Sequence, residues 1–191
     1  MAVVAGRHGL GPDRGRIIVR TFRDGLAAQA GHDLTIEATR WSGELAVNDD
    51  LSPAGLEVRV DVAALVVREG TGGVKPLTDR DRREIAVTAR KVLGADQHPE
   101  AVFTADKFQP DSSGGGEISG TFTLRGQARP LRLQVSEAGA DKYHAETQVV
   151  QSDYGIKRYT AFLGALRVRD AVDIAVDVDL SDLAANPGTG S

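Results

Sequence analysis

Residues 171–180 read AVDIAVDVDL, and this stretch decides the fold. Its apolar residues Val172, Ile174 and Val176 alternate with small or acidic residues, and the alternation continues to Leu180. Successive side chains of a β-strand point to opposite faces of a sheet. The pattern therefore predicts a strand with one apolar face and one solvated face.

The same alternation recurs along the chain between short connections rich in Gly, Pro, Asn and Ser, at residues 56–62, 118–124, 131–135 and 143–149, and more weakly at 16–22, 32–39, 41–47 and 101–108. The total of about eight or nine strands is typical of a small closed barrel. A two-sheet sandwich would show the same alternation, but a closed barrel has no exposed edges and can hold one small ligand. We therefore predict an all-β fold, a single antiparallel eight-stranded barrel.

One segment has helical periodicity. Ile85, Ala89 and Val92 follow helical spacing within residues 79–93. Thr78 and Asp81 form a capping-box pattern at the start, and Gly94 follows the last apolar residue. The sequence predicts one amphipathic helix over residues 79–93.

Composition limits the domain count and the partners. The chain has 191 residues, 41% of them hydrophobic, and no internal linker, which predicts one domain over residues 16–183 with flexible tails at 1–15 and 184–191. The net charge of -4 gives no broad basic surface for nucleic acid. Because cysteine is absent, disulfides and thiolate metal sites are excluded.

The amino-terminal residues contain no apolar stretch of signal-peptide length, which favours a cytoplasmic location. No window approaches the roughly 20 apolar residues of a transmembrane helix. A role involving lipid would then be soluble carriage or peripheral contact with a membrane.

Several motifs resemble those of the YceI-like, polyisoprenoid-binding family. They are ISGTFTLRG at 118–126 followed by RPL at 129–131, HPEAVF at 98–103, QSDYGI at 151–156 and RDAV at 169–172. The resemblance covers roughly residues 16–180 in the right order. It implies a lipocalin-like, eight-stranded barrel with a long apolar cavity for an isoprenoid chain, and it allows a homodimer.

Two departures from the family pattern concern polar positions. The family's usual amino-terminal pair of histidines is missing, and AGHDLT stands at residues 30–35 in its place. Gln151 occupies the position of the family's arginine before Ser-Asp. These differences affect the polar details of the pocket and leave the barrel pattern intact.

The sequence contains no recognisable catalytic motif. The four histidines are His8, His32, His98 and His144. They are too far apart in sequence to form a local metal pair, so we expect no metal and no cofactor. Asp33 and Asp153 lie beside glycine-bearing turns, where carboxylates commonly cap backbone amides. No nucleophile elbow, phosphate loop or zinc-protease helix is present. We therefore predict that the protein is not an enzyme.

Two polar features are candidates for contact with a ligand head group. His32 shares strand parity with Leu34 and Ile36 and should point inward near one end, although a buried histidine satisfied by backbone or carboxylate partners is the commoner case. The helix carries more basic than acidic residues, and Arg82 and Arg83 are the candidates there for a head group or an anionic membrane. The alternative for the helix is a solvated face with intrahelical ion pairs.

The candidate ligand-binding residues are mostly large and apolar, with His32 among them: Phe22, His32, Leu34, Ile36, Trp41, Leu93, Phe103, Phe122, Leu124, Tyr154, Phe162 and Leu166. The inward residues of a filled barrel would follow the same pattern as those of a hollow one. Small inward positions, Gly43, Gly120 and Ala145 among them, favour a cavity.

These observations predict non-enzymatic binding, sequestration or transport of an amphiphilic long-chain lipid, a polyisoprenoid or an isoprenoid quinone, inside the barrel. Two alternatives stay open. An enzyme could use the same pocket for a hydrophobic substrate, and a filled barrel could serve as a ligand-free interaction module.

Overall fold

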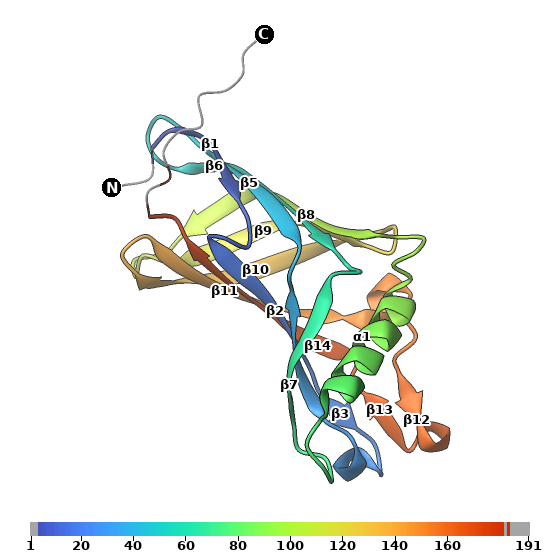
Figure 1. Ribbon diagram of the computed structural model, residues 1–191. Helices are drawn as coiled ribbons and strands as arrows, with labels where there is room; N and C mark the ends of the chain where they lie inside the picture. The colour runs from blue at the N-terminus through green and yellow to red at the C-terminus, as the bar shows by residue number, and fades with distance from the viewer. Residues whose placement is uncertain (1–3, 182, 184–191) are drawn as a thin grey trace.

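A computed structural model of the chain describes residues 4–181 and 183. The longer strands are β1 (Gly6–Leu10), β2 (Gly15–Thr21), β4 (Asp33–Ala38), β5 (Trp41–Val47), β6 (Pro53–Asp61), β7 (Leu65–Thr71), β8 (Glu100–Pro110), β9 (Gly116–Leu124), β10 (Gln127–Gly139), β11 (Lys142–Val150) and β14 (Ala171–Asp179). These strands form one 11-stranded antiparallel sheet in the order β1-β5-β6-β8-β9-β10-β11-β14-β2-β4-β7 (Figure 1).

A second, 3-stranded sheet lies at the end of the molecule away from β1 and β6 (Figure 1). It contains β12 (Thr160–Ala161), β13 (Leu166–Val168) and β3 (Arg23–Asp24), and the short 3-10 helices are η1 (Ala28–Ala30), η2 (Gln151–Tyr154) and η3 (Phe162–Gly164). We call this region, together with the loop before the main helix, the narrow end.

The main sheet curls around an interior. Thr39 and Arg40 are the only residues between β4 and β5. β4 pairs with β2, and β5 pairs with β6. The sheet can be followed from β5, through one hydrogen-bonded neighbour after another, to β6, β8, β9, β10, β11, β14, β2 and β4. β4 is the strand that comes just before β5 in the chain, so the sheet curls back toward its starting point. This arrangement confirms a curled antiparallel sheet.

The predicted count of eight strands is not confirmed, and the sheet has edges at β1 and β7. Neither strand was predicted, because GRHGL and LVVREGT do not alternate cleanly. Each pairs on one side only, β1 with β5 and β7 with β4. Backbone hydrogen bonds to a neighbouring strand can order a segment whose side chains carry no strand signal.

Residues 6–10, which lie within the amino-terminal tail predicted for residues 1–15, form β1. His8 of this strand pairs with Leu45 and is 1% exposed. Its Nε2 lies 2.6 Å from the carbonyl oxygen of Val4. The predicted carboxy-terminal tail, 184–191, lies outside the described residues.

The single α-helix is confirmed as α1 (Asp79–Leu93). The Thr78 hydroxyl accepts a hydrogen bond from the Asp81 amide, and the Asp81 carboxylate accepts one from the Thr78 amide. Gly94 ends the helix with φ 66°, a left-handed conformation that favours glycine. α1 packs against β7 beside the narrow end (Figure 1).

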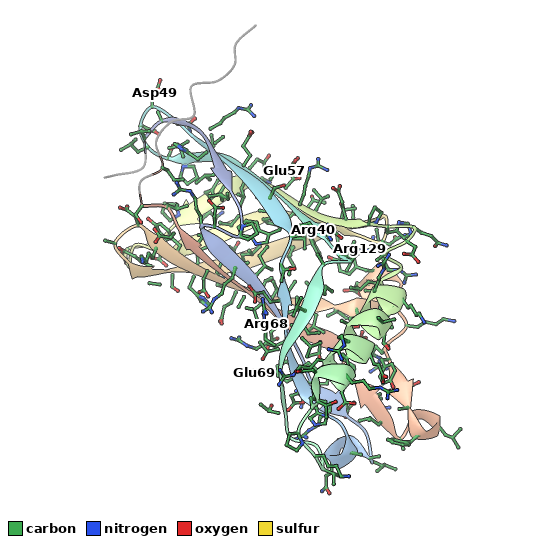
Figure 2. All side chains as sticks on the ribbon, in the orientation of Figure 1. Arg40, Asp49, Glu57, Arg68, Glu69 and Arg129 are labelled. Carbon is green, nitrogen blue, oxygen red and sulfur yellow. The ribbon has the colours of Figure 1, made fainter. Side chains whose placement is uncertain are left out.

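The outer face of the sheet is charged, as the alternation predicts. Figure 2 shows Glu57, Arg68 and Glu69 on this face. Arg68 pairs with Glu37 across β7 and β4, and Arg59 pairs with Glu57. Exposed pairs of this kind each contribute little to stability, so the sheet depends mainly on its backbone ladder and inner face.

An outer cluster links β2, β14 and β11. His144 Nδ1 lies 2.7 Å from Asp177 Oδ1 and its Nε2 lies 3.0 Å from Glu146 Oε1. Arg16 donates to the other oxygen of Asp177 at 2.9 Å. Hydrogen bonds to Glu146 and then to Asp177 raise the pKa of His144 above its usual value.

Replacing His144 with glutamine should change stability in a pH-dependent way. A raised pKa in the folded state stabilises the protein below the unfolded-state pKa, and this stabilisation is lost as the pH rises through the folded-state pKa. We expect the variant to be less stable than wild type by under about 1 kcal/mol at about pH 6 and equally stable at about pH 9, because the partners are partly exposed.

Urea denaturation at the two pH values measures this difference. His98→Gln is the matched control, because the His98 ring has no hydrogen bond or ion pair within the described part of the chain. A His144→Gln deficit that grows with pH would contradict the prediction.

Candidate functional site

The curled sheet forms the wall of a cavity of about 1470 Å³ that is partly open to solvent. Its wall is built from the apolar faces of the strands. On β14 the lining residues are Val172, Ile174, Val176 and Val178, with Leu180 just beyond the strand, which are the residues predicted to form its dry face. The same agreement holds for β11, where Tyr143, Ala145, Thr147 and Val149 line the cavity.

The interior is hollow, which the sequence could not establish. Inward residues such as Leu34, Val58 and Phe122 are only partly buried although they line the cavity. His8 is the only large side chain less than 2% exposed within the described residues. In a filled core the large inward side chains would be almost completely enclosed by their neighbours. A filled barrel is therefore excluded for this structure.

Most of the predicted ligand-binding residues lie on the cavity wall: His32, Leu34, Ile36, Trp41, Leu93, Phe103, Phe122, Leu124 and Leu166. Phe103 and Phe122 lie directly opposite each other on β8 and β9. Trp41 is 8% exposed, and its indole nitrogen has no hydrogen-bond partner among the described residues. An acceptor on a ligand could satisfy this donor, because an unpaired buried N–H is costly.

The other predicted residues do not line the cavity. Tyr154 is 3% exposed and packs edge-on against Phe122, with ring centroids 5.5 Å apart. Phe22 lies under the Arg169 guanidinium at 5.6 Å. Phe162 is 65% exposed on η3. Tyr154 therefore supports the wall from behind, whereas Phe22 and Phe162 lie away from it.

The predicted contact between the basic helix face and a ligand is not supported. Arg82 and Arg83 are absent from the cavity wall, to which α1 instead contributes Asp81, Glu84 and several apolar side chains. Arg82 lies 3.7 Å from Asp79, and Arg80 pairs with Glu84 at 2.8 Å. Arg82 and Arg83 are thus not part of the cavity wall, and intrahelical ion pairs involve Arg80 and Arg82.

His32 lies at the narrow end of the cavity, as strand parity predicts. Its Nε2 is 2.8 Å from the carbonyl oxygen of Lys75, so the backbone already satisfies one ring nitrogen. Lys75 and Arg167 also line this end, and Arg167 pairs with Asp24 at 2.9 Å. The charged side chains at this end include both signs, since Asp81 and Glu84 face the same cavity.

Apart from Leu166 and Phe108, the segments that surround the two ends of the cavity were not identified from the sequence. Residues 74–77 and 166–168 contribute at the narrow end, and residues 51–53, 108–110 and 114–117 at the other. These segments follow no single period, so hydrophobic alternation could not identify them.

Small residues play two different roles. Ala145 lines the cavity as expected, but Gly43 and Gly120 do not. A Cβ added at Gly120 would lie 2.3 Å from the carbonyl oxygen of Thr104, and one at Gly43 would lie 3.3 Å from the Glu57 oxygen. Those glycines permit close approach of neighbouring strands rather than enlarging the cavity.

Of the two carboxylates considered for catalysis, Asp33 has a structural partner, whereas Asp153 is exposed and has no hydrogen bond or ion pair within the described residues. Asp33 accepts a hydrogen bond from the Arg23 amide at 2.8 Å. Asp170 accepts from both the amide and the hydroxyl of Ser152, and the hydroxyl bond lowers the pKa of this carboxyl. Within the described residues, no group of three or more His, Asp or Glu side chains could hold a metal ion. The described residues also include no helix long and apolar enough to cross a membrane.

Solved structures share this architecture at low sequence identity. BcnA of Burkholderia cenocepacia is 13% identical, with a TM-score of 0.64 over 88% of this chain and 98% of that chain. A YCEI protein of Campylobacter jejuni is 16% identical, with a TM-score of 0.56 over 75% of this chain and 81% of that chain. These likenesses show the fold alone.

A third solved structure is a domain from Saccharophagus degradans, described as polyisoprenoid binding and as implicated in plant cell wall breakdown. It is 12% identical, with a TM-score of 0.55 over 91% of this chain and 97% of that chain. No curated protein sequence matches the chain significantly. The sequence profile of the YceI-like domain matches residues 22–180, and the chain therefore belongs to the YceI-like domain family.

Proposed function

We propose that this protein binds a long-chain amphiphilic lipid, a polyisoprenoid or an isoprenoid quinone, and holds it non-covalently for sequestration or transport. The observation that carries the proposal is the cavity of about 1470 Å³ with a mainly apolar wall. Pockets for drug-sized ligands commonly measure about 300–1,000 Å³. A cavity larger than this range suits a long chain.

Apolar burial would provide most of the affinity. Each buried methylene-sized group contributes about 0.8 kcal/mol, so a short prenyl chain can reach micromolar binding after the costs of ordering it. Selectivity among tails would be broad, because the wall offers few directional contacts. The binding activity named for the Saccharophagus degradans domain supports the same ligand class.

The polar head would lie at the narrow end, near His32 and Lys75. Both residues line the cavity there, and the Lys75 ammonium has no ion pair within the described part of the chain. Arg82 and Arg83 have no part in the proposed head-group contact, because they do not line the cavity. Carriage without catalysis is supported by the structural partner of Asp33, a carboxylate that accepts a backbone hydrogen bond.

Trp41 provides a direct test, since it is the single tryptophan and lines the cavity. Titrating delipidated protein with neutral prenyl alcohols of increasing length should change Trp41 emission saturably, with affinity rising with chain length. The midpoint should be insensitive to salt, because apolar burial is not screened. No saturable response to any chain length, together with no co-purifying lipid by mass spectrometry, would refute the proposal.

An anionic prenyl phosphate tests the position of the head group. Its affinity should fall as salt is added, and Lys75→Gln should remove most of that salt dependence. Arg83→Gln is the control, because Arg83 is exposed and does not line the cavity. An equal effect of both substitutions would place the head group elsewhere.

A further inference from the structure

The narrow end exposes large apolar side chains at the tips of two neighbouring loops. Leu26 is 101% exposed, Phe162 65% and Leu163 109%. The Ala27 amide donates to the Ala165 carbonyl at 2.8 Å, which holds the loop of Leu26 against the segment that follows Leu163. The three side chains therefore belong to one region of the surface, which we call the apolar tip.

The backbone holds the second loop in an unusual conformation. Phe162 has φ 49° and Leu163 has φ 54°, both in the left-handed region that residues with side chains seldom adopt. Non-glycine residues in this region commonly mark functional sites, where surrounding structure holds them in place. Here the result is that two large apolar side chains point into solvent.

Basic residues precede and follow Phe162 and Leu163 of the apolar tip in the sequence. Residues 155–169 contain Lys157, Arg158, Arg167 and Arg169 and no acidic residue, in a chain whose net charge is -4. Arg167 is paired with Asp24 and Arg169 lies over the Phe22 ring. Lys157 and Arg158 are exposed and form no ion pair within the described residues. Their charges are available to an anionic partner.

The same region is continuous with the cavity. Val74 is 79% exposed and Tyr159 44% exposed, and both also line the cavity. A side chain that meets both solvent and the cavity lies on the rim. The rim at the narrow end is therefore bordered by apolar side chains, with the apolar tip and the basic residues beside it.

We propose that the narrow end docks on an anionic membrane surface, with Leu26, Phe162 and Leu163 entering the interface and Lys157 and Arg158 contacting lipid phosphates. Apolar side chains on a basic background are the combination that binds anionic lipid surfaces. A protein partner would be better matched by a continuous flat patch than by side chains on separate loop tips. If the protein also exchanges a lipid between the bilayer and the cavity at this rim, that step rests on the proposed function. The docking itself does not depend on the proposed function.

Co-sedimentation with vesicles tests the docking. The full-length protein should sediment with vesicles of phosphatidylcholine and phosphatidylserine and much less with phosphatidylcholine alone. The double variant Phe162→Ser, Leu163→Ser should lower the partition coefficient roughly tenfold or more. Val4→Ser is the control, since Val4 is also an exposed apolar residue but precedes β1, which lies at the opposite end (Figure 1), and does not line the cavity. It should partition like wild type.

Charge neutralisation provides a second measurement. Replacing Lys157 and Arg158 with glutamine should weaken binding to the anionic vesicles by roughly fivefold per residue and leave binding to neutral vesicles unchanged. Wild-type protein that sediments with neither vesicle type, or an equal loss in Val4→Ser, would overturn the docking. A partner protein captured by wild type but not by the double variant, in the absence of vesicle binding, would overturn it in favour of a protein interface.

Failure of the docking and failure of the proposed function are distinguishable. Loading of a prenyl alcohol from solution, followed by Trp41 emission, requires no membrane. The double variant should load from solution with wild-type affinity and lose only transfer from vesicles. Vesicle binding by wild type without loading from solution would leave the docking intact and refute lipid carriage.

Discussion

Replacing Phe122 with arginine is expected to weaken binding of a prenyl lipid at least about 100-fold, because it places an unpaired charge on an apolar wall. Phe122 lines the cavity opposite Phe103 and packs against Tyr154. Its neighbour on β10 is Arg129, so the new guanidinium would also meet a like charge. The same change should lower the free energy of unfolding by about 3–5 kcal/mol.

Two further variants separate loss of binding from loss of folding. Phe122→Leu keeps an apolar side chain and should reduce affinity less than about tenfold. Ala145→Phe adds bulk to the cavity without a charge and should reduce binding while the protein remains folded, since Ala145 lines open space. Titration of Trp41 emission, with urea denaturation alongside, measures both effects. A folded Phe122→Arg protein with unchanged affinity would show that Phe122 does not contact the ligand.

Replacing Gly120 with alanine is expected to destabilise the protein by about 2–3 kcal/mol. The added Cβ would lie 2.3 Å from the Thr104 carbonyl oxygen and 2.8 Å from the Ala105 Cβ, so β8 and β9 would have to separate. Gly120 lies opposite Ala105, next to the irregularity in register between Ala105 and Lys107. The atoms close to the added Cβ include backbone atoms, which cannot move aside as a flexible side chain could.

Gly9→Ala is the matched control, being the same substitution at another glycine within a strand. A Cβ at Gly9 has no heavy atom within 4 Å in the described structure, so its effect should stay within about 0.5 kcal/mol. Urea denaturation of both variants gives the comparison. Equal stabilities for the two would mean that the β8–β9 contact relaxes around the added methyl group.

The faces of the long strands were predictable from the sequence. Val172 to Leu180 line the cavity at every second position, as do the alternating residues of β11. The pleat of a strand forces this alternation whatever the surroundings. The bounds of α1 were equally predictable, because the Thr78 capping box and Gly94 are local signals that need no partner.

Edge strands and rim loops were not predictable in this way. β1 and β7 are ordered by pairing with β5 and β4, and pairing uses backbone groups that every sequence possesses. The outward position of Phe162 depends on the backbone conformation of one loop. The direction of Arg82 and Arg83 depends on which face of α1 packs against β7, which the charge count did not reveal.

The sequence by itself determined an antiparallel β-fold with one capped helix, and it determined which side of each long strand is apolar. Only the tertiary structure decided that the interior is a cavity of about 1470 Å³, that the main sheet has 11 strands, and which loops form the rim. The physical reason is that alternation and capping are properties of neighbouring residues in the chain. The space between opposite walls depends on how far apart the curled sheet holds them, and a filled interior and a hollow one have the same local pattern.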